Sequence, residues 1–401
     1  MINLLKGSSY FALSSYIVVI FSALVTIVNG KILTAEDFGL IAISMLFTSM
    51  LESLKQLGFK EYLISQSILP NQNLQEQVAW TLDFIKGIVL CIISLVSIPY
   101  LVSAYNEPRL ELMIVIISVS FIFESIASPK LYLARKNLEY KVTVKISFFS
   151  SLIYCISSIL LVLHFKSYLG VIYGLLIRSL ASSFLSYFFY SVKPNFTFNK
   201  DVALKQFRYG KWILASGIVF YFTNRFDNLV LSINVSLEEL GYYGFAYSVV
   251  NGVLGGPIKS INSALFPILS KGGHGLRKKQ VVACLFLVGI ILAILMYYTL
   301  PFIVVEFIGA KWDSSTSIIS ILAIAFCVNG IKVDGYFLAN KKPNYKFIVE
   351  VVRGAVIIFL CIPMVNQYGG IGAAWSLLIA NIFSLFVWLY MIRTLDEINM
   401  E

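Results

Sequence analysis

Charged residues are scarce in this chain of 401 residues. Asp, Glu, Lys and Arg make up 13% of it, whereas hydrophobic residues make up 58%. The mean hydropathy of +0.83 lies far above that of soluble globular proteins. We therefore predict an integral membrane protein in which no segment is left over for a soluble domain.

Metal-ligating and nucleotide-binding patterns are missing from the sequence as well. The chain has 2 histidines, and its 5 cysteines lie inside apolar segments without CxxC spacing. It contains no HExxH motif, no Walker-type loop and no GxGxxG loop. We expect no catalytic residue, no bound metal and no cofactor, although coupling to H⁺ or Na⁺ stays open.

Long apolar runs are what the sequence has in abundance. A stretch of roughly 20 residues crosses about 30 Å of hydrocarbon as a helix. Twelve such stretches lie at 8–30, 38–57, 78–101, 110–128, 144–164, 167–190, 209–232, 241–267, 280–304, 314–338, 347–366 and 369–392. The predicted fold is an all-α polytopic membrane protein with about 12 transmembrane helices, and its longest connections are 58–77 and 191–208.

The basic residues alternate from one connection to the next. The two ends and the connections after even-numbered spans hold 21 of the 31 Lys and Arg residues, and the other connections hold 4. The positive-inside rule places the first set, and with it both termini, in the cytoplasm. The net charge of +10 is then a topology signal and an attraction to anionic membrane lipids, not a sign of nucleic-acid binding.

Three pairs of short phrases recur about 200 residues apart. The pairs are "YLARKNLEYK" (132–141) with "FLANKKPNYK" (337–346), "LTAEDFG" (33–39) with "VSLEELG" (235–241), and "SYLGV" (167–171) with "QYGGI" (367–371). Six spans per half give both halves the same orientation. We predict two six-helix lobes, 1–200 and 201–401, related by a pseudo-two-fold axis along the membrane normal, which is a plan typical of transporters.

Six cations fall inside predicted spans, where an ionisable residue costs about 2.5 to 3.5 kcal/mol and generally faces a cavity or a partner. Arg178 and Arg225 lie near mid-span, and Lys86 and Lys259 lie at least two turns inside. The predicted substrate site in a central cleft consists of Arg178, Arg225, Lys259, Lys86, Asn224, Asp227, Asn228 and Asn29. Lys332 and Arg353 are weaker members, because snorkelling to the cytoplasmic side explains them equally well.

These cations outnumber the nearest acids, Asp83 and Asp227. A surplus of Arg and Lys favours an anionic ligand, and the guanidinium group suits phosphate because it binds two oxygens at once. The implied substrate is therefore anionic or amphipathic, and a phosphate-bearing lipid is both. Hydrogen bonding between helices is the alternative explanation for the polar residues, and Arg353 can also pair with Glu350 one turn earlier.

Five stretches carry a resemblance to a known family. They are "KGSSYFALSSY" (6–16), "LTAEDFGLIAIS" (33–44), "RFDNLVLSINVSLEELGYYGFAYSV" (225–249), "GGPIKSINSALFPILSK" (255–271) and "YGGIGAAWSLLIA" (368–380). In this order and spacing the sequence resembles the Wzx-type oligosaccharide flippases. They belong to the MOP superfamily, which also contains MATE drug exporters and lipid II flippases.

The resemblance implies a transporter, not an enzyme, of the bacterial inner membrane. Its substrate would be undecaprenyl-diphosphate-linked repeat units of O-antigen, lipopolysaccharide or exopolysaccharide, moved to the periplasmic leaflet by alternating access. A polysaccharide polymerase and chain-length machinery are its implied partners. One alternative is a MATE-like exporter of drugs or organic ions, which would be expected to have dominant acids in its cavity. A glycan polymerase or ligase would need a large external loop, whereas the external connections here have about 5 to 12 residues.

Overall fold

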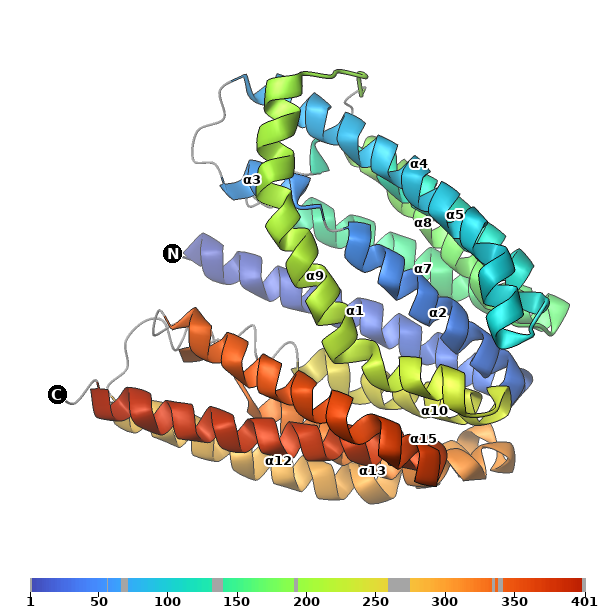
Figure 1. Ribbon diagram of the computed structural model, residues 1–401, viewed down its shortest axis with the longest axis vertical. Helices are drawn as coiled ribbons and strands as arrows, with labels where there is room; N and C mark the ends of the chain where they lie inside the picture. Colours follow the sequence, from blue (N-terminus) through green and yellow to red (C-terminus); the bar gives the residue numbers. More distant parts are fainter. Residues whose placement is uncertain are drawn as a thin grey trace. The chain divides into compact units, whose positions relative to one another are not determined.

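The computed structural model describes residues 2–55, 57–65, 71–131, 140–190, 194–258, 275–333, 336–337 and 342–398. Within these ranges the regular structure is helical, without a β-strand (Figure 1). Seven helices of the described part are long and apolar enough to cross a membrane. The chain is therefore an all-α, multi-pass membrane protein as predicted, whereas the count of twelve spans stays a prediction.

The chain divides into two compact units. Unit 1 comprises residues 1–42 and 222–401, and unit 2 comprises residues 43–221. The predicted lobes rest on the sequence repeat, and their boundary near residue 200 stays a prediction. Each unit is described by itself below.

Unit 2 is built from helical hairpins. Its elements are the larger part of α2 (Ala35–Lys55), then α3 (Phe59–Ser65), α4 (Gln72–Tyr105), α5 (Arg109–Ser125), α7 (Tyr140–Phe165), α8 (Leu169–Phe189) and the first part of α9 (Lys200–Asn234). Helices α4 and α5 pack against each other, as do α7 and α8, and α5 also contacts α8 (Figure 1).

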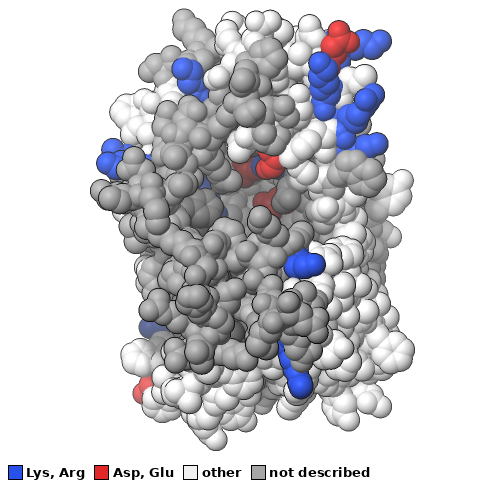
Figure 2. All heavy atoms as spheres, turned by 90° about the vertical axis from the view of Figure 1, so that its left-hand side faces the viewer, with Lys and Arg blue, Asp and Glu red and all other residues white. Residues whose placement is uncertain are grey.

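The predicted connection 58–77 contains short helix α3 and the first turns of α4. Helix α3 is stabilised because Phe59 and Leu63 are buried against Ala79 and Trp80 of α4. The predicted connection 191–208 likewise includes the start of α9, where Lys200, Lys205, Arg208 and Lys211 are exposed. Figure 2 views the molecule from the left-hand side of Figure 1, and Lys and Arg side chains gather at the upper right of that view.

Unit 1 contains the first helix together with the second half of the chain. Its elements are α1 (Ile2–Ile32), the start of α2, the end of α9, α10 (Leu237–Val250), the π-helix η1 (Asn251–Gly255), α12 (Gly275–Ile303), η2 (Val304–Ile308), η3 (Ala310–Trp312), α13 (Asp313–Ile331) and α15 (Pro343–Ile398). Helix α1 packs against α10, η1 and η2. At Gly369, with φ 54° and ψ −131°, α15 breaks into two helices, and the break separates the last two predicted spans.

One of the sequence echoes forms matching local structures. In "LTAEDFG" the Thr34 hydroxyl accepts a hydrogen bond from the Asp37 N–H at 3.2 Å, and in "VSLEELG" the Ser236 hydroxyl accepts one from the Glu239 N–H at 3.2 Å. Each therefore caps the N-terminus of the helix that follows. In the pair "SYLGV" and "QYGGI", the residues with positive φ do not correspond: Lys166 (φ 48°) precedes the first segment, whereas Gly369 (φ 54°) lies within the second.

The capped helices α2 and α10 meet at their echoed glycines. A Cβ atom on Gly39 would collide with the carbonyl oxygen of Leu237, and one on Gly241 would collide with that of Ala35. Glycine at both positions lets the two backbones approach closely. The third echo, 132–141 with 337–346, lies outside the described residues at 132–139 and 338–341.

Candidate functional site

The residues of the predicted site divide between the two units. Unit 2 holds Lys86 and Arg178, and unit 1 holds Asn29, Asn224, Arg225, Asp227, Asn228, Lys332 and Arg353. Lys259 lies outside the described residues. The convergence of these side chains on one central cleft therefore stays a prediction.

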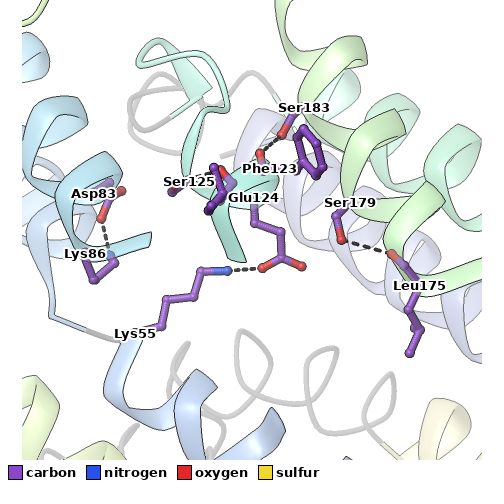
Figure 3. A network of polar contacts seen from close by, with 10 residues as sticks. Lys55, Asp83, Lys86, Phe123, Glu124, Ser125, Leu175, Ser179 and Ser183 are labelled. Atoms are coloured by element: carbon purple, nitrogen blue, oxygen red, sulfur yellow. Dashed lines mark hydrogen bonds and ion pairs between the residues drawn. The ribbon is translucent and has the colours of Figure 1, made fainter. Parts of the chain in front are cut away.

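Lys86 of unit 2 lies beside an acid. Its ammonium group forms an ion pair with Asp83, one turn earlier on α4 (Figure 3). The same group lies 5.3 Å from the centre of the Phe59 ring. The Lys86 and Asp83 side chains are 10% and 5% exposed. Burial of a charge is costly unless the charge is paired, and here the pair supplies the compensation. The positive charge of Lys86 is thus matched locally.

A second ion pair, between Lys55 at the end of α2 and Glu124 near the end of α5, belongs to the same region (Figure 3). The segment that carries Glu124 is fixed by α8, where Ser183 and Tyr187 donate to the carbonyl oxygens of Phe123 and Ile126. Glu124 therefore lies within the protein's own hydrogen-bonded framework. The sequence alone did not reveal this partner.

Arg178 of α8 is held differently. Its guanidinium carbon lies 5.8 Å from the centre of the Tyr154 ring on α7. A cation over an aromatic face is stabilised by the ring quadrupole. No ion pair found in the described part of the chain involves Arg178, and the residue is half-buried. Its N–H donors are therefore not neutralised by a described carboxylate.

Unit 1 repeats this arrangement with Arg225. The guanidinium carbon of Arg225, on α9, lies 5.7 Å from the centre of the Tyr247 ring on α10. Arg225 is half-buried and, within the described ranges, takes part in none of the ion pairs. Tyr247 also lies within electrostatic range of Asp227 and Arg353, so these charged groups form one cluster.

Asp227 is the buried acid of this cluster, at 3% exposure. One carboxylate oxygen accepts a hydrogen bond from the Tyr243 hydroxyl at 2.6 Å, and the other accepts one from the Asn228 side-chain amide at 3.1 Å. Both donors are neutral. The predicted residues Asp227 and Asn228 are thus brought together, and Tyr243 is added to them.

Arg353 of α15 also belongs to this cluster. Its Nη1 atom donates to the side-chain oxygen of Asn224 and to Glu350, each at 3.2 Å. The predicted pair of Arg353 with Glu350 is confirmed. Arg353 is 8% exposed, so its guanidinium is bonded inside the protein and does not extend outward.

Lys332 and Asn29 lie apart from these contacts. Helix α13 ends at Ile331, so Lys332 follows the helix, and the predicted span 314–338 was wrong in continuing through it. Its backbone is extended, with ψ 105°, and its ammonium group donates to the Ser384 hydroxyl at 2.6 Å. Asn29 is 2% exposed, and its Oδ1 atom has no hydrogen-bond partner among the described residues.

Sequence reasoning missed the tyrosines. Tyr154, Tyr243 and Tyr247 stand in apolar spans, where an aromatic residue gives no sign of a polar role. The spacing of Tyr243 and Tyr247 was the available signal, because residues four apart share a helix face. That face of α10 meets the Arg225 and Asp227 side chains of α9.

A sequence model of the family described as "Polysaccharide biosynthesis protein" matches residues 30–313. The lipopolysaccharide biosynthesis protein WzxC of Escherichia coli (strain K12) is 23% identical over 399 residues, which cover 95% of this chain and 79% of WzxC. The teichuronic acid biosynthesis protein TuaB of Bacillus subtilis (strain 168) is 22% identical over 333 residues, which cover 80% of this chain and 68% of TuaB.

Two solved structures share the fold. The lipid II flippase MurJ, in an inward closed conformation, has a TM-score of 0.74 at 16% identity, over 96% of this chain and 87% of MurJ. An inward-facing multidrug resistance MATE family transporter of the MOP superfamily has a TM-score of 0.70 at 13% identity, over 97% of this chain and 99% of that chain. The predicted resemblance to Wzx-type proteins is confirmed, and the chain belongs to the polysaccharide biosynthesis protein family.

Proposed function

We propose that this protein is a flippase for undecaprenyl-diphosphate-linked oligosaccharide repeat units. It moves them from the cytoplasmic to the periplasmic leaflet of the bacterial inner membrane by alternating access. Support comes from the family and from two relatives named for lipopolysaccharide and teichuronic acid biosynthesis. The transporter fold adds support for translocation without an enzymatic step. The distribution of Lys and Arg supports cytoplasmic termini.

One observation carries the proposal. Each unit has an arginine that lies over a tyrosine ring and takes part in none of the ion pairs of the described residues. Arg178 lies over Tyr154 in unit 2, and Arg225 lies over Tyr247 in unit 1. An arginine held by a ring face keeps its N–H groups available for phosphate oxygens, which it binds in pairs. We assign the diphosphate to these two arginines.

The remaining predicted residues take supporting parts in this proposal. Asn224, Asp227, Asn228 and Arg353 surround Arg225 and supply polar contacts to the headgroup. Lys259, Asn29 and Lys332 stay in the proposed site as further polar or cationic contacts. The polyprenyl tail remains in the lipid, because the amphipathic substrate needs a polar environment for its headgroup alone.

The membrane potential contributes to the direction of transport. Moving one charge through 100 mV is worth about 2.3 kcal/mol, so an inside-negative potential favours outward movement of a diphosphate of charge about −2 by roughly 4 to 5 kcal/mol. This gain is reduced to the extent that cleft cations move with the substrate. Downstream, a polymerase and chain-length machinery would use the flipped unit.

The test is the position of the lipid-linked repeat unit in cells that lack this protein and any redundant flippase. We expect the unit to accumulate on the cytoplasmic leaflet, and wild-type protein to restore its delivery. Arg178→Ala and Arg225→Ala should each reduce delivery by about tenfold or more, since a hydrogen bond to a charged group is worth about 1.5 to 3 kcal/mol.

Arg109→Ala is the matched control. Arg109 of unit 2 is already paired with Glu107 at 2.8 Å, so its loss should leave delivery near the wild-type value. All three variants should reach the membrane at equal levels. Normal delivery in the deletion strain would overturn the flippase proposal, whereas normal delivery by both Arg→Ala variants would remove these arginines from the site.

A further inference from the structure

The start of α9 in unit 2 carries a mixed basic and apolar surface that the proposed transport site does not use. Four large apolar side chains are more than half exposed there, namely Phe196, Phe198, Leu204 and Phe207. Two cations, Lys200 and Arg208, are exposed as well. These six side chains are called the interfacial face below.

The segment that precedes α9 is fixed on α4 (Figure 1). The Asn195 N–H donates to the Gln77 side-chain oxygen at 2.8 Å, and the Thr197 N–H donates to the Thr81 hydroxyl at 3.1 Å. The acceptors are four residues apart and share one face of α4. Because the backbone is held on both sides of Phe196, the exposure of this ring belongs to the folded structure of unit 2.

Helix α9 continues the same surface. Its start is capped by Asn199, whose side-chain oxygen accepts a hydrogen bond from the Val202 N–H at 3.1 Å. The four helical members of the interfacial face follow the spacing i, i+4, i+7, i+8, which places them on one side of the helix. A different side is buried, where the Gln206 side-chain amide donates to the Gln75 carbonyl oxygen at 3.2 Å.

The length of α9 indicates where this face lies. The helix has 35 residues and is about 52 Å long, whereas the hydrocarbon core of a membrane is about 30 Å thick. The predicted span 209–232 leaves residues 200–208 outside the hydrocarbon. Cations are costly inside the hydrocarbon, and exposed phenylalanine rings gain free energy by leaving water. The headgroup region of the membrane meets both requirements.

The sign of the charge selects the kind of lipid. Residues 194–211 contain four cations and one acid, and the positive-inside rule predicts that they are cytoplasmic. Anionic lipids of the cytoplasmic leaflet attract basic segments next to a membrane span. An acidic soluble protein would match the cations alone, whereas a lipid surface also matches the exposed phenylalanines.

We propose that the interfacial face binds anionic phospholipids of the cytoplasmic leaflet. Lys200 and Arg208 contact the phosphate groups, and the four apolar side chains lie among the upper parts of the acyl chains. This contact attaches the start of α9, and through it α4, to the membrane surface. The inference concerns membrane attachment and does not rest on the proposed flippase function.

The test is photo-crosslinking of the full-length protein in phosphatidylcholine nanodiscs. The nanodiscs contain a trace of photoactivatable phosphatidylglycerol or photoactivatable phosphatidylcholine, and mass spectrometry locates the labelled residues. We expect phosphatidylglycerol to label residues 194–211 about tenfold more than phosphatidylcholine. Lys200→Gln/Arg208→Gln should remove most of this preference, because each cation beside the membrane contributes a factor of about five.

The matched control is Lys31→Gln/Lys166→Gln, which removes two exposed cations from connections predicted to be external. It should leave the labelling of residues 194–211 unchanged. None of these substitutions removes a hydrogen bond between the segment and α4, so each variant should elute in size-exclusion chromatography like the wild type.

A second pair of measurements separates the two kinds of contact. Phe198→Ser/Phe207→Ser should lower labelling by both lipids several-fold and keep the preference for phosphatidylglycerol. Raising the salt concentration should lower that preference and leave labelling by phosphatidylcholine unchanged, because salt screens charge. Equal labelling by the two lipids, or an unchanged preference in Lys200→Gln/Arg208→Gln, would overturn the proposal. Absence of labelling at residues 194–211 would overturn it too and would favour an acidic protein as the partner.

Discussion

The two units stabilise their buried acids in different ways. In unit 2, Asp83 forms an ion pair with Lys86 on the same helix. In unit 1, Asp227 accepts hydrogen bonds from the neutral side chains of Tyr243 and Asn228. Arg225, two residues before Asp227, lies instead on the Tyr247 ring.

This difference shows that the number of cations in the spans overstates how many of them can bind an anion. Lys86 lies near mid-helix like Arg178, yet its charge is matched by Asp83. What distinguishes the two arginines is their partner, a tyrosine ring in each unit. The comparison therefore separates the lysine, whose charge is matched within the protein, from the two arginines, to which we propose that phosphate binds.

The largest expected effect is on stability and separates the two acids. Asp83→Asn removes the carboxylate that faces a lysine of 10% side-chain exposure, and breaking a buried ion pair costs about 3 to 5 kcal/mol. Asp227→Asn should cost about 1 kcal/mol, because the amide oxygen still accepts from the Tyr243 hydroxyl. Reversible unfolding in mixed micelles, followed by circular dichroism, measures both.

The double variant Asp83→Asn/Lys86→Met is the control for this comparison. It removes both charges, and replacing a buried pair by uncharged side chains is often close to neutral. Most of the lost stability should therefore return. Equal costs for Asp83→Asn and Asp227→Asn would show that the two units do not differ in this way.

A smaller effect tests the likeness of the two echoed helix starts, both of which lie in unit 1. Thr34→Ala and Ser236→Ala each remove a side chain that caps a helix, which costs about 1 kcal/mol. Thr34→Ala should cost more, because the Thr34 hydroxyl also donates to Asp37 at 2.9 Å. The same unfolding measurement applies, with Thr34→Ser as the control that keeps the cap. A change in stability at one cap alone would argue that the echo is not a structural equivalence.

Much of the fold follows from the sequence because its signals are local. Apolar length predicts the helices, and the break at Gly369 coincides with the predicted start of the last span. The helix starts after Thr34 and Ser236 follow from their capping residues. Helix α3 escaped prediction because its order comes from Phe59 and Leu63 packing on α4, a contact between elements.

In the candidate site, too, local contacts were predictable and contacts between distant residues were not. The pairing of Arg353 with Glu350 was predictable from a spacing of three residues on one helix. The pair of Lys55 with Glu124 joins residues 69 positions apart, and no local pattern announces it. The contacts of the arginines with tyrosines depend on how neighbouring helices are rotated about their axes. The rotation of each helix is set by its packing, which a single sequence does not display.

The smallest expected effect tests the feature that the two units share. Tyr154→Leu and Tyr247→Leu remove the ring beneath Arg178 and Arg225, and a cation–π contact is worth about 0.5 to 1 kcal/mol. Pyrophosphate binding should therefore weaken about two- to fivefold in each variant, since 1.4 kcal/mol corresponds to a factor of ten. Tyr154→Phe and Tyr247→Phe keep the ring and should bind like the wild type. If the Leu and Phe variants bind alike, ring contact does not position the arginines, and the parallel between the units reduces to a coincidence of packing.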